Sequence, residues 1–428
     1  KDMAQGDRTP NELTSYVSDN LRGDPGTTCV LKLERPTADS TYIPMELKIT
    51  RGTIRTNPVP YYGMVDKNIG YIAISTFAIE GCSKDIKKAL IELKQQGATS
   101  IVLDLRGNGG GLLSEAVNVV NFFVPKGKEI VVTKGKIKQA GSTYKTSNEP
   151  IDMEIPLTVL VDGATASAAE IVSGSLQDLD RAVIVGNRTY GKGLVQVPRE
   201  LPYNSSMKVT TAKYYIPSGR CIQAIDYAKR NADGSVARIP DSLTTVFHTA
   251  AGREVRDGGG IRPDVEVKAE RFPNIMFYLL NDDMIFDYAT QYCIKHPNIG
   301  EVKDFSVTDA DYDDFKQMLK KRNFTYDRQS EKSLKNLKEI AEFEGYMEGA
   351  SEEFAALEKK LTHNLDHELN RFSKQIRKAI AEEIVKRHYF QRGVILERMK
   401  DDADLTKAIE TLKDKEGYTK ILSVPADK

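Results

Sequence analysis

Apolar and polar positions divide the chain into three stretches with different periodicities. Residues 1–60 predict short β-strands around one helix: TPNELTSYVSDNLRG is amphipathic and ends at a glycine, whereas TCVLKLERP and PMELKITRG alternate as strands do. Between about residues 61 and 270, helical patterns alternate with apolar runs, which are IGYIAIS, SIVLDLRG, PLTVLVDG, RAVIVG and LVQV. This alternation predicts an α/β domain with a substantially buried sheet.

Residues 271–428 predict a mostly helical, charge-rich region. Within it, apolar residues recur every three or four positions, which predicts one stripe on a long helix: Phe354, Leu357, Leu361, Leu365, Leu369, Phe372, Ile376 and Ile380. We interpret this stripe as packing within the region or as a contact between subunits. A homodimer formed through the helical region is therefore one expectation.

Length and composition predict a globular protein of two or three domains. The chain has 428 residues, which is too long for one ordinary core. Its 61 basic and 61 acidic residues cancel, so we expect no attraction to nucleic acid or to an anionic membrane. Four scattered cysteines without a C-x-x-C pair predict neither a disulfide framework nor a zinc site.

The stretch GNRTYGKG, residues 186–193, fits all but the last position of the phosphate-loop pattern G-x-x-x-x-G-K-[ST]. Gly193 stands where a magnesium-binding hydroxyl belongs. A phosphate loop also needs a helix directly after it, yet GLVQVPRELP predicts a strand that ends at a proline. The order is therefore strand, glycine-rich turn, strand, as in a hairpin, which disfavours a nucleotide site. Lys192 is then either a surface lysine in a hairpin turn or a lysine with another chemical role.

Ser167 lies where a predicted buried strand turns into a helix, in PLTVLVDGATASAAEIVSGSLQD. One interpretation is a capping box, with Ser167 as the N-cap and Glu170 as the third helical residue. The same place suits a nucleophile, because the helix dipole and the free amide of Ala168 favour negative charge nearby. Local sequence alone leaves both interpretations open.

A serine nucleophile needs a base, and Lys192 is the candidate. None of the five histidines sits where a Ser–His–Asp arrangement in the core would use it. A lysine serves as a base if an apolar pocket keeps it neutral, and the sequence places no carboxylate next to Lys192. Gln196 falls on the same strand face four residues later, so it is suited to orient the amine without holding its charge.

The glycine run 109–111 follows the predicted strand SIVLDLRG and precedes an amphipathic helix. Three glycines in this position give backbone amides close access to an oxyanion, although a tight turn explains one glycine equally well. We interpret Asp104 and Arg106 as a structural pair that shapes this turn.

Five motifs occur in one order within residues 1 to about 270: DLRGNGGGLL, TASAAEI, NRTYGKGLVQ, TTAKYYIPSGRCIQ and GGIRPDV. Together they resemble the carboxyl-terminal processing peptidases, also called tail-specific proteases, which are Ser–Lys endopeptidases. The separation of 25 residues between Ser167 and Lys192 matches this family. The resemblance implies a crotonase-like or ClpP-like protease core of β-sheet and helices over residues 61–270, followed by the helical region 271–428.

The resemblance also assigns roles in catalysis. It implies Ser167 as the nucleophile, Lys192 as the general base and Gln196 as the residue that orients the lysine. It further implies an oxyanion hole made by the amides of Gly111 and Ala168, with Gly110 as the alternative to Gly111. The chain departs from the family at Ala169, which is often serine, and at Gly109, which is often proline; neither position carries the chemistry. No cofactor and no metal are implied.

Residues 1–60 resemble the second half of a PDZ domain, a module that captures peptide C-termini by strand addition. The expected substrates are therefore proteins or peptides with flexible, apolar C-terminal tails. The family resemblance also implies an extracytoplasmic location, in the bacterial periplasm or cell envelope. No signal segment is evident from KDMAQGD onward. Two alternatives stay open, a crotonase-type acyl-thioester enzyme and an inactive PDZ-containing scaffold.

His363 and His367 have the spacing of metal ligands on a helix. However, HNLDH lacks the glutamate of H-E-x-x-H and no third ligand is evident, so we interpret them as exposed helix residues.

Overall fold

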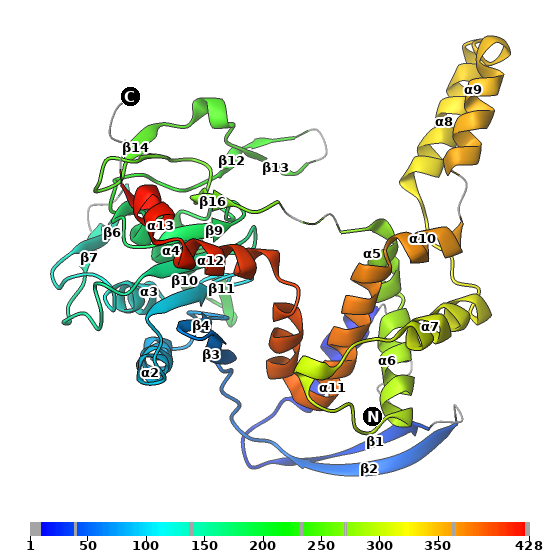
Figure 1. The fold of residues 1–428 in the computed structure, drawn as a ribbon, viewed down its shortest axis with the longest axis horizontal. Helices are drawn as coiled ribbons and strands as arrows, with labels where there is room; N and C mark the ends of the chain where they lie inside the picture. Colours follow the sequence, from blue (N-terminus) through cyan, green and yellow to red (C-terminus); the bar gives the residue numbers. More distant parts are fainter. Residues whose placement is uncertain are drawn as a thin grey trace. The chain divides into compact units, whose positions relative to one another are not determined.

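The computed structural model describes residues 10–423 except 38–40, 137–140, 232–233, 269, 271 and 362–363 (Figure 1). Contacts between Cα atoms divide the described chain into two compact units. One unit combines the described residues of Lys1–Arg55 and Arg271–Lys400, and the core unit combines Thr56–Glu270 with Asp401–Lys428. The described residues from 401 to 423 group with the α/β core, whereas the sequence placed them in the helical region 271–428.

The core unit contains two larger sheets. The six-stranded sheet has the order β16–β9–β8–β5–β4–β3; only β3 is antiparallel to its neighbour. Its strands are β3 (Tyr61–Asp66), β4 (Ile69–Ala73), β5 (Ser100–Asp104), β8 (Leu157–Val161), β9 (Val183–Gly186) and β16 (Val265–Glu266). The four-stranded antiparallel sheet has the order β10–β11–β6–β7 and consists of β6 (Glu129–Lys134), β7 (Ser142–Lys145), β10 (Leu194–Leu201) and β11 (Ser205–Tyr215).

Two short antiparallel ribbons complete the strands of this unit. They are β12 (Ile225–Arg230) with β13 (Val236–Arg238), and β14 (Val246–His248) with β15 (Glu254–Arg256); the short helix η2 (Asp241–Leu243) lies between them in sequence. The apolar runs predicted as core strands are thus β4, β5, β8, β9 and β10. The predicted α/β organisation of residues 61–270 is confirmed at this level.

Helices cover both faces of the six-stranded sheet. Ile101 and Leu103 of β5 join one apolar core with α2 (Cys82–Gln95), α3 (Leu113–Val120) and α4 (Ala168–Asp178). Val102, between them, is equally buried but points to the other face, since successive side chains of a strand alternate. The helix α12 (Ala403–Lys413) contacts β5, β8 and β9, and α13 (Lys415–Leu422) contacts β9. The C-terminal helices therefore supply the second layer.

Arg106 fastens α12 to the core. Its guanidinium pairs with Asp104 (Nη2–Oδ2, 2.6 Å) and forms two hydrogen bonds with Asp402, the N-cap of α12, at 2.9 and 2.7 Å. A further bond reaches Asp404 at 3.1 Å. The predicted Asp104–Arg106 pair is confirmed, and it also receives a bond from the Tyr71 hydroxyl to Asp104 (2.6 Å).

The other unit is built from helices and one β-ribbon. Its elements are α1 (Pro10–Leu21), β1 (Thr28–Pro36), β2 (Tyr42–Thr50), α5 (Asn274–Asn281), α6 (Met284–Lys295), η3 (Val302–Asp304), α7 (Asp309–Lys321), α8 (Gln329–Phe343), α9 (Met347–Leu361), α10 (Leu365–Arg371) and α11 (Ser373–Met399). The strands β1 and β2 pair in antiparallel register, as expected from their alternation. The helices α5, α6, α7, α10 and α11 bury a shared core of aliphatic and aromatic side chains.

The expectation of one long helix carrying the stripe from Phe354 to Ile380 is wrong. The stripe is distributed over α9, α10 and α11. Phe372 is the residue that divides α10 from α11, with φ −105° and ψ 19°. Leu369, Ile376 and Ile380 do lie in the core of their unit, which explains their spacing, whereas Leu357 is 43 % exposed.

Among the described residues, no helix is both long enough and apolar enough to cross a membrane.

We predict that Asp402→Ala lowers the free energy of unfolding of the core unit by about 2–4 kcal/mol, because it removes a helix cap and two charged hydrogen bonds. Urea unfolding followed by circular dichroism measures this. Lys407→Ala, on an exposed part of the same helix, is the matched control and should change the free energy by less than about 0.5 kcal/mol. Equal effects of the two changes would contradict the role given to Arg106.

Candidate active site

Three of the sequence motifs follow neighbouring strands of the six-stranded sheet. The strands β5, β8 and β9 are adjacent and parallel. The glycine run follows β5, the turn with Ser167 follows β8, and the link with Lys192 follows β9. Because the carboxyl ends of parallel strands lie at the same edge of a sheet, this strand order brings the three loops together.

Ser167 occupies a sharp turn between β8 and α4. Its φ of 58° lies in the left-handed region, which is strained for a residue with a side chain. Two bonds hold the turn: the Thr165 hydroxyl donates to the Leu105 carbonyl (2.9 Å), and the Ala166 amide donates to the Asn108 carbonyl (2.9 Å). Ser167 is half-buried at the N-terminus of α4, as predicted.

Glu170 connects the Ser167 turn with the Lys192 link. The predicted capping box is present, and Oε2 of Glu170 accepts a hydrogen bond from the Ser167 amide (2.9 Å). The same oxygen accepts a bond from the Lys192 amide (2.8 Å). Its other oxygen accepts bonds from the Thr189 hydroxyl (2.5 Å) and the Gly191 amide (2.7 Å). The main chains of Ser167 and Lys192 thus both lie within 3 Å of one carboxylate oxygen.

The four donors determine which form of Glu170 fits this place. Burial raises the pKa of Glu170 to about 7, whereas the bonds from Thr189, Lys192, Gly191 and Ser167 act in the opposite direction. A protonated carboxyl would place a donor against groups that are themselves donors. Glu170 therefore makes all four bonds as a carboxylate at pH values above about 7, whereas burial keeps it protonated below that pH.

Lys192 lies in a link between two sheets. The sequence predicted strand, turn, strand, which is confirmed, but the hairpin is wrong: β9 belongs to the six-stranded sheet and β10 pairs with β11 in the four-stranded one. The glycines on each side of Lys192 permit this passage, since a Cβ on Gly191 or Gly193 would lie within 2.3 or 2.8 Å of residues 223–224. No helix follows the lysine, which agrees with the exclusion of a phosphate loop.

Every backbone N–H and C=O group of residues 191–193 has a hydrogen-bond partner. The amides of Gly191 and Lys192 donate to Glu170, and the amide of Gly193 donates to the side chain of Gln223. The carbonyl of Gly191 accepts from the Ala224 amide, and that of Gly193 accepts from the Tyr214 amide. The carbonyl of Lys192 accepts from the Tyr214 hydroxyl. The main chain that carries the lysine is therefore held on all sides.

The side chain of Lys192 is less constrained than its backbone. The residue is half-buried, and within the described part of the chain its amine forms no ion pair with a carboxylate. Gln196 lies next to a β-bulge in β10, and its Nε2 donates to the Thr210 hydroxyl at 3.5 Å. Its proposed contact with Lys192 stays a prediction.

The glycine run lies directly against the Ser167 turn. A Cβ on Gly110 would lie 2.7 Å from the Ala166 carbonyl oxygen and 2.8 Å from both the Ala168 amide nitrogen and the Ser167 Cβ. Gly111 has φ 148°, and a Cβ there would meet the backbone of Phe77. Only glycine fits these two positions. The buried Asn108 keeps them in place, because its side-chain oxygen accepts from the Gly110 amide (2.9 Å).

Two amides remain near this junction for a ligand. Ala168 is the first residue of α4, so its N–H has no acceptor within the helix. Gly111 lies between two residues bonded to Phe77, and no acceptor for its own amide occurs among the described residues. The Gly110 amide is engaged by Asn108, which disfavours Gly110 as the alternative donor.

Two segments of the chain match models of known protein families. Residues 68–229 match the model of "Peptidase family S41", and residues 275–412 match "Probable PDZ-protease, C-terminal helical domain". Residues 68–229, which carry the three loops described above, are thus similar to peptidase family S41. The resemblance to carboxyl-terminal processing peptidases drawn from the five motifs is thereby confirmed.

Individual relatives and one solved structure are similar to parts of this chain. The chain is 37 % identical over 226 residues to a carboxy-terminal-processing protease of Bartonella bacilliformis, covering 51 % of this chain and 50 % of the relative. It is 40 % identical over 200 residues to the carboxyl-terminal-processing protease of a Picosynechococcus species, covering 46 % of each. The chain thus spans about half the length of these relatives. A solved photosystem II D1 C-terminal processing protease is 29 % identical over 60 % of each chain, with a TM-score of 0.38.

The roles of some residues in this core were not predicted from the sequence. Glu170 was identified only as a helix cap, and its bonds to the lysine link could not be inferred from a spacing of three residues. Tyr214 and Gln223 lie within the motif TTAKYYIPSGRCIQ, so the motif itself was the available signal. Asn108 similarly lies within DLRGNGGGLL, between the strand and the glycines.

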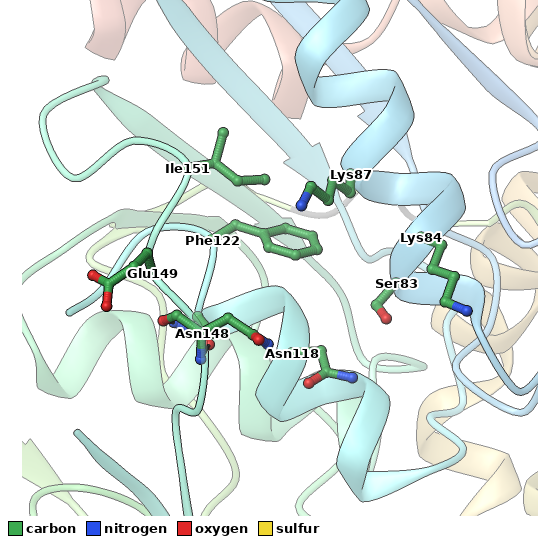
Figure 2. A pocket seen from close by; sticks show the side chains of 9 residues that line it. Ser83, Lys84, Lys87, Asn118, Phe122, Asn148, Glu149 and Ile151 are labelled. Atoms are coloured by element: carbon green, nitrogen blue, oxygen red, sulfur yellow. Dashed lines mark hydrogen bonds between the residues drawn. The ribbon is translucent and has the colours of Figure 1, made fainter. Parts of the chain in front are cut away.

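A separate pocket of about 240 Å³ lies between α2, α3 and the loop after β7 (Figure 2). Its lining includes Lys84, Lys87, Asn118, Phe122 and Ile151, and none of the predicted site residues. We place the candidate active site at the loops after β5, β8 and β9, because three of the sequence motifs converge there.

The described residues contain no group of three or more side chains suited to hold a metal ion. His367 lies in α10, and its amide is bonded to the N-cap Asn364. His363 lies outside the described residues.

We predict that Gly110→Ala lowers kcat/KM by at least about 100-fold, because the new methyl group displaces the Ser167 turn. Gly109→Ala is the matched control: a Cβ on Gly109 meets nothing within 4 Å and its φ is not positive, so we expect nearly unchanged activity. Peptide hydrolysis by both purified variants measures the difference. Full activity of Gly110→Ala would contradict the close approach of the two loops.

The raised pKa of Glu170 predicts a pH dependence of stability. Between its ordinary value of 4.5 and about 7, the folded protein holds a proton that the unfolded chain has released. The contribution of this group to the free energy of unfolding therefore falls as pH rises through that window. Urea unfolding at pH 5, 6, 7 and 8 should show the wild type losing stability relative to Glu170→Gln. A constant difference between the two proteins would refute the raised pKa.

Proposed function

We propose that this chain is a serine endopeptidase that processes proteins near their C-termini, with Ser167 as nucleophile and Lys192 as general base. The observation that carries the proposal is the shared carboxylate of Glu170, bonded to the backbone amides of both residues. Among the described residues no carboxylate pairs with the Lys192 amine, which supports the proposal further, because such an ion pair would hold the amine in its charged form.

The first half of the reaction forms an acyl-enzyme. Neutral Lys192 takes the proton from the Ser167 hydroxyl while Oγ attacks the scissile carbonyl carbon. The tetrahedral intermediate collapses as the C–N bond breaks, and the protonated lysine gives its proton to the leaving amine. The fragment on the C-terminal side of the scissile bond leaves with its new amino group. The fragment on the N-terminal side remains joined to Ser167 as an ester.

The second half releases the acyl group. Lys192, again neutral, takes a proton from water, whose oxygen attacks the ester carbonyl. The C–O bond to Ser167 breaks, and the lysine returns its proton to the serine oxygen. Atoms and charges balance without a cofactor. Gln196, on β10, orients the amine in this proposal, as the family resemblance implies.

The oxyanion is stabilised by the amides of Gly111 and Ala168. The two segments lie in contact through Gly110, and neither amide has another acceptor in the described structure. A donor of this kind contributes about 2.7–4 kcal/mol to transition-state stabilisation. The first turn of α4 adds its dipole at the same place.

The proposed substrates are proteins or peptides with flexible, apolar C-terminal tails. Such a tail reaches the site as an extended strand, and β10, an edge strand that begins two residues after Lys192, is a suitable partner for it. The ribbon β1–β2 with α1 is proposed as part of a PDZ module that receives the tail. By the same family resemblance we propose that the enzyme is extracytoplasmic. We also propose a homodimer formed through the helical region, and sedimentation measures this oligomeric state.

We expect Ser167→Ala and Lys192→Ala each to lower hydrolysis of an unfolded protein by at least about 1,000-fold, because either change removes the acyl-transfer chemistry. Mass spectrometry of the products identifies the cleavage sites and the residual rate. Lys213→Ala, an exposed lysine on β11, is the control and should remain active. An active Ser167→Ala variant would instead favour acyl-thioester chemistry, and an inactive wild type would favour a scaffold.

A further inference from the structure

Tyr214 joins the two catalytic segments at a point that Glu170 does not reach. Its side chain is 2 % exposed and projects from β11. The hydroxyl donates to the Lys192 carbonyl oxygen and lies 3.3 Å from the Ser167 carbonyl oxygen. Since a hydroxyl has one proton, the bond to Lys192 is the main one and the Ser167 carbonyl receives the weaker branch.

The strand that carries Tyr214 gives its hydroxyl a fixed position. β11 lies inside the four-stranded sheet, paired with β10 on one side and with β6 on the other. The Tyr214 amide donates to the Gly193 carbonyl (3.0 Å), and the ring belongs to the apolar core beneath α3 and α4. Backbone and side chain of one residue thus bind two successive carbonyls of the lysine link.

Burial raises the pKa of the Tyr214 hydroxyl well above its ordinary value. The hydroxyl therefore keeps its proton, and remains a donor, at neutral and mildly alkaline pH. It carries no charge, and it contacts main-chain atoms rather than the reacting hydroxyl and amine. The hydroxyl thus lies between the Ser167 turn and the Lys192 link and contacts the main chain of both.

We propose that Tyr214 is a positioning residue, whose buried hydroxyl fixes the Lys192 peptide relative to the Ser167 turn and so sets the approach of amine to hydroxyl. This inference rests on the proposed Ser–Lys function. Glu170 holds the amide side of both residues, and Tyr214 holds their carbonyl side. Together the two side chains restrain the peptide groups before and after Lys192.

The two carbonyls depend on Tyr214 to different extents. The Ser167 carbonyl also accepts bonds from the amides of Glu170 and Ile171. The Lys192 carbonyl has no second donor among the described residues. Removal of the hydroxyl therefore frees the lysine peptide while the serine turn stays capped, and the change acts on the base rather than on the nucleophile.

The test is Tyr214→Phe, which keeps the ring and removes the hydroxyl. With a peptide amide substrate we expect kcat to fall about 10- to 100-fold, because a shift of about 1 Å costs as much, while KM changes less than about twofold. Tyr215→Phe is the matched control: it is the next residue on β11, with its ring under Lys134, and should keep wild-type kinetics. Wild-type kcat in Tyr214→Phe would overturn the inference.

A second measurement separates positioning from a general folding defect. In a Lys192→Ala background, Tyr214→Phe should cause no further loss in the residual hydrolysis of a peptide nitrophenyl ester, because the amine that it positions is absent. An equal loss in both backgrounds would show that Tyr214 supports the fold only, and would overturn the inference. Near-normal peptide hydrolysis by Lys192→Ala alone would refute the Ser–Lys function itself, and this inference with it.

If Tyr214→Phe does not fold, 3,5-difluorotyrosine at position 214 replaces it in the test. Fluorine lowers the pKa of the phenol, and an ionised phenolate donates no hydrogen bond. We expect kcat of this protein to fall at the pH where the ultraviolet absorbance of the phenolate appears, whereas kcat of the wild type does not fall there. An unchanged kcat at a pH where the absorbance shows the phenolate would contradict the proposal.

Discussion

The site depends on one buried carboxylate. Glu170 is fully buried, and all the groups around its oxygens are donors: two amides of the lysine link, the amide of Ser167 and the hydroxyl of Thr189. A carboxylate in such a place is stable only while these bonds are made, because an unpaired buried charge costs several kcal/mol. The need to satisfy Glu170 therefore fixes the distance between two segments that come from different strands and lead to different sheets.

The topology of the sheet makes this interaction possible. The loops after β5, β8 and β9 meet at one edge because their strands are parallel neighbours. The glycine at position 110 then permits the first loop to touch the second, and the passage of the chain from β9 to β10 brings the Lys192 amide to Glu170, beside the Ser167 turn. On the opposite face, Arg106 binds the N-terminus of α12 through Asp402 and closes the layer that supports these strands.

The sequence predicted most of the local elements of the core but not the contacts between them, and the catalytic roles of Ser167, Lys192 and Gln196 stay predictions. Apolar runs predicted the core strands, and a serine before a helix predicted the Ser167 turn. The second role of Glu170 was hidden, because a capping box has the same spacing whether or not the carboxylate has further partners. The hairpin around Lys192 was wrong because alternation in sequence does not tell which strand pairs with which. The return of residues 401–413 to the core depended equally on a distant partner, Arg106.

We propose that these restraints place the amine of Lys192 beside the hydroxyl of Ser167 in the working enzyme. The most direct measurement is a crystal structure of the wild-type protein with a product peptide bound, from which the distance between Nζ and Oγ is read. We predict a distance of about 2.6–3.2 Å, the reach of a base that removes the proton, with no carboxylate bonded to the amine. An amine turned away from Ser167, or paired with an acidic side chain, would contradict it.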